Sequence, residues 1–175
     1  MPRRGIIVFV LVLLLATAGI FGYRQLGAGH PAGPTIGGPF ALVDGEGHAV
    51  TDRDFRGKIM LVYFGYTHCP DACPTALNQI AVTLDKLGAK AADVRAVFIT
   101  VDPERDPPDV KPASDANYGS GIVGLTGSVE AVRQAEVGYK VYAAKHPTTG
   151  GDYDMDHSSI IYVMDRDGRF VTNFS

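Results

Sequence analysis

The chain has 175 residues, which is enough for one folded domain of common size and a short additional segment. Its formal net charge is −3 and no cluster of lysine and arginine follows the first few residues, which argues against a nucleic-acid-binding protein. Its two cysteines are too few for a disulfide-rich scaffold and indicate a single functional pair.

The N-terminal segment, residues 1–23, has the pattern of a transmembrane anchor. Arg3 and Arg4 precede an apolar stretch from Ile6 to Tyr23, about as long as a helix that crosses a bilayer. The arginines are expected to stay cytoplasmic, which predicts a single-pass protein of the cell's inner membrane with its domain on the periplasmic or extracytoplasmic side. The alternative is a cleaved signal peptide, because Ala16-Thr17-Ala18 resembles a processing site. Either way, the cysteines reach a compartment that permits disulfides.

The residues after the anchor are predicted to form a linker and then one domain. Residues 24–38 are rich in glycine, proline and alanine, which is typical of a flexible linker. The domain is predicted over residues 39–175. It should open with a β-hairpin in residues 40–50, which contain an Asp-Gly turn, and continue with a buried central strand at 59–64.

The rest of the domain alternates between helical and strand patterns. Apolar residues recur at helical spacing after the cysteines, and Gly88 is placed to end that helix; they are Leu77, Ile80, Ala81, Leu84 and Leu87. The later elements are predicted to be two strands, a helix and a final hairpin, at residues 94–101, 122–125, 128–136 and 159–172. This order predicts an α/β fold with a mixed central sheet.

Cys69 and Cys73 lie between the central strand and the first helix. Proline is tolerated only in the first turn of a helix, so Pro74 indicates a helix that begins at about Asp71 to Cys73, with Asp71 as a suitable N-cap. Unpaired N–H groups and the helix dipole at such a site stabilise a thiolate. Both sulfurs are therefore predicted to favour the anionic form.

The spacing of the two cysteines is compatible with several roles. In a helix-like turn their Cα atoms are about 6 Å apart, within the range of a disulfide. The pair could form a reversible redox couple, or bind one soft metal ion, for which Cu(I) is favoured and Zn(II) competes. A purely structural disulfide is a further alternative, although closing so short a loop stabilises a fold very little.

Three histidines of the predicted domain have ordinary explanations. His48 lies in the first hairpin and His146 in a loop rich in proline and glycine. His68 is next to Cys69, and neighbouring side chains usually diverge. Each is expected to be a surface or turn residue.

His157 stands in a more informative place, directly before the last hairpin. Loops at strand ends of α/β sheets often carry site residues. From the residues alone His157 is either a structural histidine or a nitrogen ligand. Asp156 is a candidate to orient the ring, whereas Met155 is expected to pack in the interior rather than to serve as a soft ligand.

Four blocks of the sequence point together to a known family. They are Phe64-Gly65-Tyr66-Thr67-His68-Cys69-Pro70-Asp71-Ala72-Cys73-Pro74, Val101-Asp102-Pro103-Glu104-Arg105-Asp106, Gly124-Leu125-Thr126-Gly127 and Asp156-His157-Ser158. In their order and spacing across residues 36–175 they resemble the Sco/SenC family of copper proteins that assist cytochrome c oxidase assembly. The resemblance implies a thioredoxin-like fold and a copper ion, Cu(I) or Cu(II), bound by Cys69, Cys73 and His157. Asp71 and Asp102 are candidate helpers near that site.

The resemblance implies a membrane-tethered copper metallochaperone for the binuclear copper centre of the oxidase, rather than an ordinary enzyme. Its partner would be the copper-receiving subunit, with another copper chaperone or a thioredoxin-like reductant as further candidates. The alternative is a thiol–disulfide oxidoreductase that uses Cys69 and Cys73 to keep the partner's copper-ligand cysteines reduced. A peroxiredoxin-like peroxidase is disfavoured, because that chemistry has no stated use for His157.

Two features depart from the family pattern. Lys111-Pro112 interrupts the helix that family members usually carry after the second block, so this helix is expected to be short or loop-like. The chain ends at Ser175, where the family generally continues into a C-terminal helix. That helix is expected to be absent, which would leave part of one sheet face exposed.

Overall fold

The computed structural model describes residues 35–108 and 121–175, and Thr35–Ser175 forms one compact unit. The predicted anchor, nearly all of the linker, and the helix expected near Lys111-Pro112 lie outside the described residues. Within the described ranges, no helix combines the length and the apolar character that a membrane span requires.

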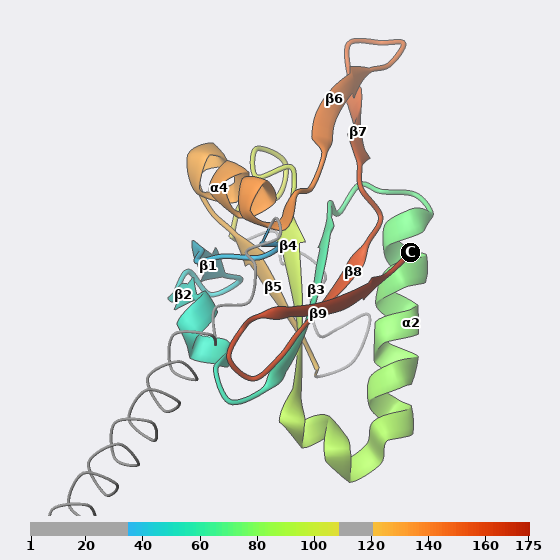
Figure 1. The fold of residues 1–175 in the computed structure, drawn as a ribbon. Coiled ribbons are helices and arrows are strands. Elements are labelled where there is room, and N and C mark those ends of the chain that lie inside the picture. Colours follow the sequence, from blue (N-terminus) through green and yellow to red (C-terminus); the bar gives the residue numbers. More distant parts are fainter. Residues whose placement is uncertain (1–34, 109–120) are drawn as a thin grey trace, which may run out of the picture. The chain divides into compact units, whose positions relative to one another are not determined.

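A mixed sheet forms the body of the domain (Figure 1). In the described part of the chain it has seven strands in the order β2-β1-β5-β4-β3-β8-β9. Strands β3, β4 and β5 are parallel to one another, and the remaining pairs are antiparallel. The strands are β1 (Ala41–Asp44), β2 (Ala49–Thr51), β3 (Ile59–Gly65), β4 (Val94–Thr100), β5 (Ile122–Thr126), β8 (Ile161–Met164) and β9 (Phe170–Phe174).

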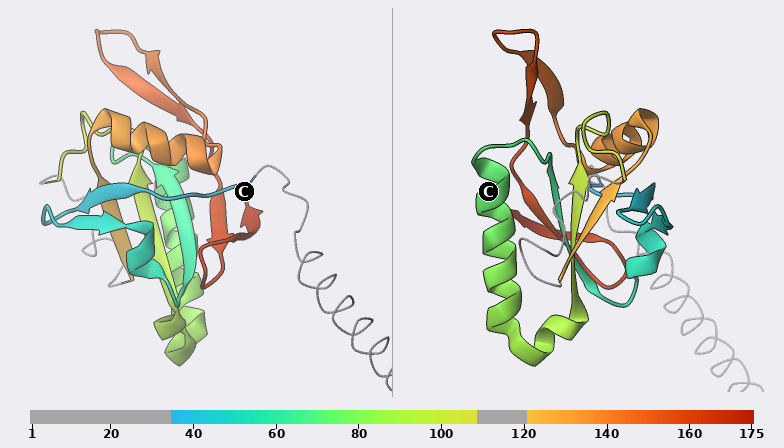
Figure 2. Two further views of the ribbon diagram at one scale, coloured as in Figure 1. Left: turned by 60° about the vertical axis from the view of Figure 1, so that its left-hand side comes forward. Right: turned by 180° about the vertical axis from the view of Figure 1, so that it is seen from behind.

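Within the described residues, one helix covers each face of this sheet (Figures 1 and 2). Helix α2 (Ala72–Leu87) follows β3, and helix α4 (Val129–Tyr139) follows β5. Short 3-10 helices, η1 (Asp52–Phe55) and η2 (Gly88–Asp93), precede β3 and β4. The predicted core strands, both hairpins and both helices are thereby confirmed, including the end of α2 at Gly88.

Strand β3 lies in the middle of the sheet and divides its side chains between the two faces. Tyr63 and Phe64 are both fully buried but point to opposite sides, as successive residues of a strand do. Phe64 packs against Tyr139 of α4, with ring centroids 5.3 Å apart. Tyr63 faces α2, where its hydroxyl lies 3.8 Å from the Cys73 sulfur. The continuous apolar run of β3 is therefore explained by its position, because helices cover the strand on both faces of the sheet.

A second, two-stranded sheet projects from this body (Figure 1). It consists of β6 (Ala143–Pro147) and β7 (Tyr153–His157), which pair antiparallel. The prediction placed His146 of β6 in a loop, and this was wrong. Most side chains of the hairpin are partly or fully exposed, so its strands lack the apolar alternation that reveals a half-buried strand.

The ends of the two helices differ in how they are capped. Ser128 caps α4, since its hydroxyl accepts a hydrogen bond from the Ala131 backbone N–H at 3.1 Å. Asp71 occupies the same position before α2, yet its side chain makes no capping hydrogen bond. The predicted start of α2 is therefore confirmed, while the predicted capping contact of Asp71 is absent.

Candidate metal centre

The turn between β3 and α2 carries the two cysteines. The Cys69 N–H donates to the carbonyl of Tyr66 at 3.2 Å, which closes the turn. Cys73 lies in the first turn of α2, and its backbone N–H donates to Cys69 Sγ at 3.3 Å. An N–H group that has no partner within the helix is thus directed at a sulfur, as predicted from the helix start. Both cysteines are free thiols, Cys69 half-buried and Cys73 buried.

Gly65, the last residue of β3, makes room for the buried thiol. A Cβ added to Gly65 would lie 2.7 Å from Cys73 Sγ and 2.9 Å from the Phe98 ring. Only a residue without a side chain allows the first turn of α2 to approach the strand this closely. Gly65 was not among the predicted site residues, although a glycine that ends an apolar run signals a close approach of this kind.

His157 reaches the thiols from the far end of the chain. It is the last residue of β7, and its Nε2 lies 3.5 Å from Cys73 Sγ. The ligand atoms of Cys69, Cys73 and His157 all lie within 4.8 Å of one another. Within residues 35–108 and 121–175 this is the one group of three or more His, Cys, Asp or Glu side chains that could hold a metal ion.

The orientation of the His157 ring presents the correct nitrogen to the sulfurs. Its Nδ1 lies 3.2 Å from the carbonyl oxygen of Ser158. Because a carbonyl can only accept, Nδ1 carries the hydrogen and the Nε2 lone pair faces Cys73. Burial lowers the pKa of His157, which favours the neutral ring that a metal ligand requires.

The predicted role of Asp156 in orienting His157 was wrong. The nearest basic group to its carboxylate is the exposed His146, with Nδ1 3.7 Å away, and the Ser158 carbonyl holds the His157 ring instead. Successive residues of a strand point to opposite faces, so Asp156 and His157 diverge. Met155 is buried in the core, in agreement with its predicted packing role.

Aromatic side chains surround His157 and the buried thiol. The rings of Tyr66 and Tyr63 meet the imidazole edge to face, with centroids 5.7 and 6.3 Å away. The Tyr63 hydroxyl also lies 3.1 Å from the Ser159 hydroxyl. These rings exclude water from one side of the three donors and restrict rotation of the imidazole.

The prediction that both sulfurs favour the anion was wrong for Cys73. Burial raises the pKa of the Cys73 thiol to about 12, and the neighbouring Cys69 sulfur contributes to the rise. The stabilising effect of a helix start is outweighed there by the loss of water around the thiol. Without a metal, Cys73 therefore keeps its proton at neutral pH.

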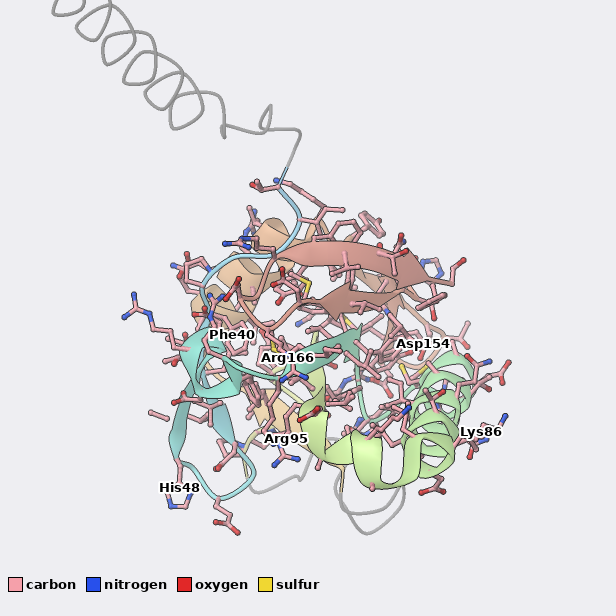
Figure 3. All side chains as sticks on the ribbon, turned by 60° about the horizontal axis from the view of Figure 1, so that its bottom comes forward. Phe40, His48, Lys86, Arg95, Asp154 and Arg166 are labelled. Carbon is pink, nitrogen blue, oxygen red and sulfur yellow. The ribbon has the colours of Figure 1, made fainter. Side chains whose placement is uncertain are left out.

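The other predicted residues lie outside the group of three donors. His48 occupies the β1–β2 turn beside Asp44, at the outer edge of the domain (Figure 3). His68 is exposed and contacts the Thr67 hydroxyl, as expected for a turn residue. Asp71 is exposed. Asp102 is buried and contacts Arg105 and Tyr153 rather than the thiols.

A comparison with protein families matches residues 28–175 to the SCO1/SenC family. "Protein sco1" of Schizosaccharomyces pombe is 40% identical over 145 residues, which cover 81% of this chain and 55% of that protein. "Protein SCO1 homolog, mitochondrial" of Homo sapiens is 37% identical over 148 residues, covering 83% of this chain and 49% of that protein. The chain thus spans about half the length of these two relatives.

Solved structures show the same fold. ScoI of Bradyrhizobium japonicum with copper bound has a TM-score of 0.76 and 49% identity, covering 80% of this chain and 89% of that one. BsSco, described as a Sco family member with a disulfide switch, has a TM-score of 0.63 and 26% identity, covering 80% and 83%. These likenesses confirm the predicted thioredoxin-like fold of mixed α/β type. The chain belongs to the SCO1/SenC family.

Proposed function

We propose that this protein is a membrane-tethered copper metallochaperone that assists assembly of the binuclear copper centre of cytochrome c oxidase. One ion, Cu(I) or Cu(II), is held by Cys69, Cys73 and His157. The observation that carries the proposal is the convergence of these donors within 4.8 Å from segments more than 80 residues apart. The related ScoI binds copper, and BsSco is described as one of the cytochrome c oxidase assembly proteins.

The donor set suits a copper ion that has to be released. Two sulfurs satisfy Cu(I), and an added imidazole nitrogen satisfies Cu(II). Cys73 must lose its proton when the ion binds, so its burial makes binding depend on pH. Cys69 is only half-buried, and a three-ligand site keeps a position open through which a thiolate of the receiving protein can begin ligand exchange.

The membrane arrangement is part of this proposal. Residues 1–23 would anchor the chain, residues 24–38 would serve as linker, and residues 39–175 would form the copper domain on the periplasmic or extracytoplasmic side. The copper-receiving subunit of the oxidase is the proposed partner, and another copper chaperone would load the site.

A second candidate function is thiol–disulfide exchange. It is supported by two free thiols within 4.8 Å of each other and by the disulfide switch described for BsSco. A thiolate formed at the half-buried Cys69 would attack a partner disulfide, release one partner thiolate and form a mixed disulfide. Cys73 would then displace the second partner sulfur, so that two electrons pass to the partner and a Cys69–Cys73 disulfide remains. A thioredoxin-like reductant would restore the dithiol.

The decisive experiment titrates Cu(I) and Cu(II) into the reduced full chain and its His157→Ala variant. We expect one ion per wild-type chain. We also expect His157→Ala to lose most of its Cu(II) affinity and its thiolate-to-copper absorption, because Cu(II) loses its only nitrogen ligand, while Cu(I) binding by the two sulfurs persists.

The matched control is His146→Ala, which removes an exposed histidine from the same hairpin. It should bind both ions as the wild type does. Full Cu(II) absorption in His157→Ala would refute the three-ligand site. Loss of thiol–disulfide exchange with a small disulfide in Cys69→Ser, but not in His157→Ala, would identify the oxidoreductase chemistry.

A further inference from the structure

The loop Val101–Asp106, which follows β4 and is called the β4 loop below, contacts the cysteine turn on one side. The Asp106 carboxylate is fully buried and accepts hydrogen bonds from the backbone N–H of Thr67, at 3.0 Å, and from the Thr67 hydroxyl. Thr100 donates to the same carboxylate at 2.6 Å. The cysteine turn is therefore held against the end of β4 through Thr67, which lies two residues before Cys69.

The same loop holds the strand that carries His157. Arg105 Nε donates to Asp102 at 2.5 Å, and its Nη1 donates to the carbonyl of Tyr153 at 2.8 Å. The guanidinium also lies over the Tyr153 ring, 3.8 Å from its centroid, and the Tyr153 hydroxyl donates to Asp102 at 2.9 Å. Tyr153 is the first residue of β7 and His157 is the last.

These contacts are well shielded from solvent. The side chains of Arg105 and Asp102 are 19% and 1% exposed. An ion pair in such surroundings is screened much less than a surface pair and holds its geometry through directed hydrogen bonds. The pair between Lys145 of β6 and Glu104 of the β4 loop is about half exposed and should contribute little.

The β6–β7 hairpin depends on such ties for its position. A two-stranded sheet is marginally stable alone, and this one pairs with no further strand in the described part of the chain. Besides the Arg105 contacts, its polar contacts with the body are the bond between Tyr153 and Asp102, the exposed Lys145–Glu104 pair and the approach of His157 to Cys73, while the Met155 side chain packs in the core.

We propose that Arg105, held by Asp102, is a positioning residue for His157. It fixes β7 so that the imidazole stays within reach of the two sulfurs, and it thereby sets the affinity for Cu(II) relative to Cu(I). This inference rests on the proposed copper site. Cu(II) depends on the nitrogen ligand, whereas Cu(I) is satisfied by the two sulfurs, so loosening β7 should affect the two ions differently.

A double-mutant cycle tests whether Arg105 acts through His157. Arg105→Met keeps most of the apolar stem and removes the charge and the donors. We expect it to lower Cu(II) affinity by about 10–100-fold, as is typical when a group that orients a ligand is lost, and to leave Cu(I) affinity near the wild-type value. In the His157→Ala background the same substitution should cause no further loss of Cu(II) affinity.

A measurement without metal completes the test. Hydrogen exchange of the β6 and β7 amides should be faster in Arg105→Met than in the wild type, while exchange in β3 and β4 is unchanged. The control is Arg166→Met, which breaks the Arg166–Asp93 pair near the other end of β3 and should alter neither copper affinity nor exchange in the hairpin. If Arg105→Met does not fold, Tyr153→Phe removes only the bond to Asp102 and should shift both readouts in the same direction by less.

Each outcome separates the two proposals. If His157→Ala binds Cu(II) like the wild type, the copper site itself is wrong. If His157→Ala loses Cu(II) but Arg105→Met does not, only the role of Arg105 fails. That role would also be overturned if Arg105→Met lowered the Cu(I) and Cu(II) affinities equally, or if its loss of Cu(II) affinity added to that of His157→Ala in the double variant. Unchanged hydrogen exchange in the hairpin would overturn it as well.

Discussion

At the scale of single residues, the site depends on atoms that come close only in the folded domain. Cys73 Sγ is surrounded by Gly65, the Tyr63 hydroxyl, the Cys69 sulfur and His157 Nε2. Burial among these groups keeps the Cys73 thiol protonated in the absence of metal. At the start of the helix, the Cys73 backbone N–H donates to the Cys69 sulfur. Cys73 is therefore the buried ligand that has to release a proton when a metal binds, and Cys69 is the half-buried ligand that a partner can reach.

Gly65→Ala tests this close packing. The added methyl group would overlap Cys73 Sγ and the Phe98 ring, so either the first turn of α2 or the ring has to move. We expect a loss of stability of about 1–3 kcal/mol, measured by urea unfolding, together with weaker Cu(I) binding.

Gly138→Ala in α4 is the matched control. Its added Cβ would meet no atom closer than 3.6 Å. Stability should stay the same or rise by up to about 1 kcal/mol, because alanine favours a helix. A Gly65→Ala variant as stable as this control would contradict the close approach.

At the scale of elements, the β4 loop joins parts of the fold that bring the ligands together. Asp106 holds the cysteine turn, and Arg105 holds the start of β7. The backbone carbonyl of Asp106 also accepts a hydrogen bond from the Thr126 hydroxyl at the end of β5. Parallel strands place their carboxyl ends at one edge of the sheet, which is why the loop after β4 reaches both the turn after β3 and the end of β5.

Asp106→Ala should therefore weaken the fold and the site together. It leaves the fully buried Thr100 hydroxyl without its acceptor, which costs about 1–3 kcal/mol, and it removes both Thr67 bonds that hold the cysteine turn. We expect a loss of about 1–3 kcal/mol in urea unfolding together with weaker copper binding. Asp167→Ala, in the exposed β8–β9 turn, should change stability by less than about 0.5 kcal/mol. Comparable values for the two variants would show that the β4 loop does not hold the turn.

At the scale of the whole molecule, the stability of the domain should depend on the proton of Cys73. The thiol has a pKa of about 12 in the folded domain, against 9.0 for an ordinary cysteine. Between these values the folded state binds more protons than the unfolded state, so stability falls as pH rises. The contribution is fully present below pH 9 and is lost as pH rises through about 12.

Urea unfolding of the reduced, metal-free chain at several pH values from 8 to 11 measures this effect, with Cys73→Ala as the control. The wild type should lose stability more steeply than the variant above pH 9, because only the wild type carries the shifted thiol. Parallel curves for the two proteins would mean that burial does not raise the pKa of Cys73.

The sequence by itself determined the core elements and the placement of the two cysteines side by side. A buried strand such as β3 and an amphipathic helix such as α2 leave regular apolar patterns in neighbouring residues. One helical turn brings Cys69 and Cys73 to the same side. The family resemblance, rather than local chemistry, favoured His157 over a structural histidine.

Only the tertiary structure decided the contacts between distant segments. The exposed β6–β7 hairpin leaves no periodic trace, so neither its strands nor the Arg105–Tyr153 contact could be predicted from local pattern. The burial of Cys73 and the divergence of Asp156 from His157 likewise depend on what packs around them. Desolvation and side-chain direction arise from the assembled surroundings of a residue, and these include segments that the chain brings in from far away.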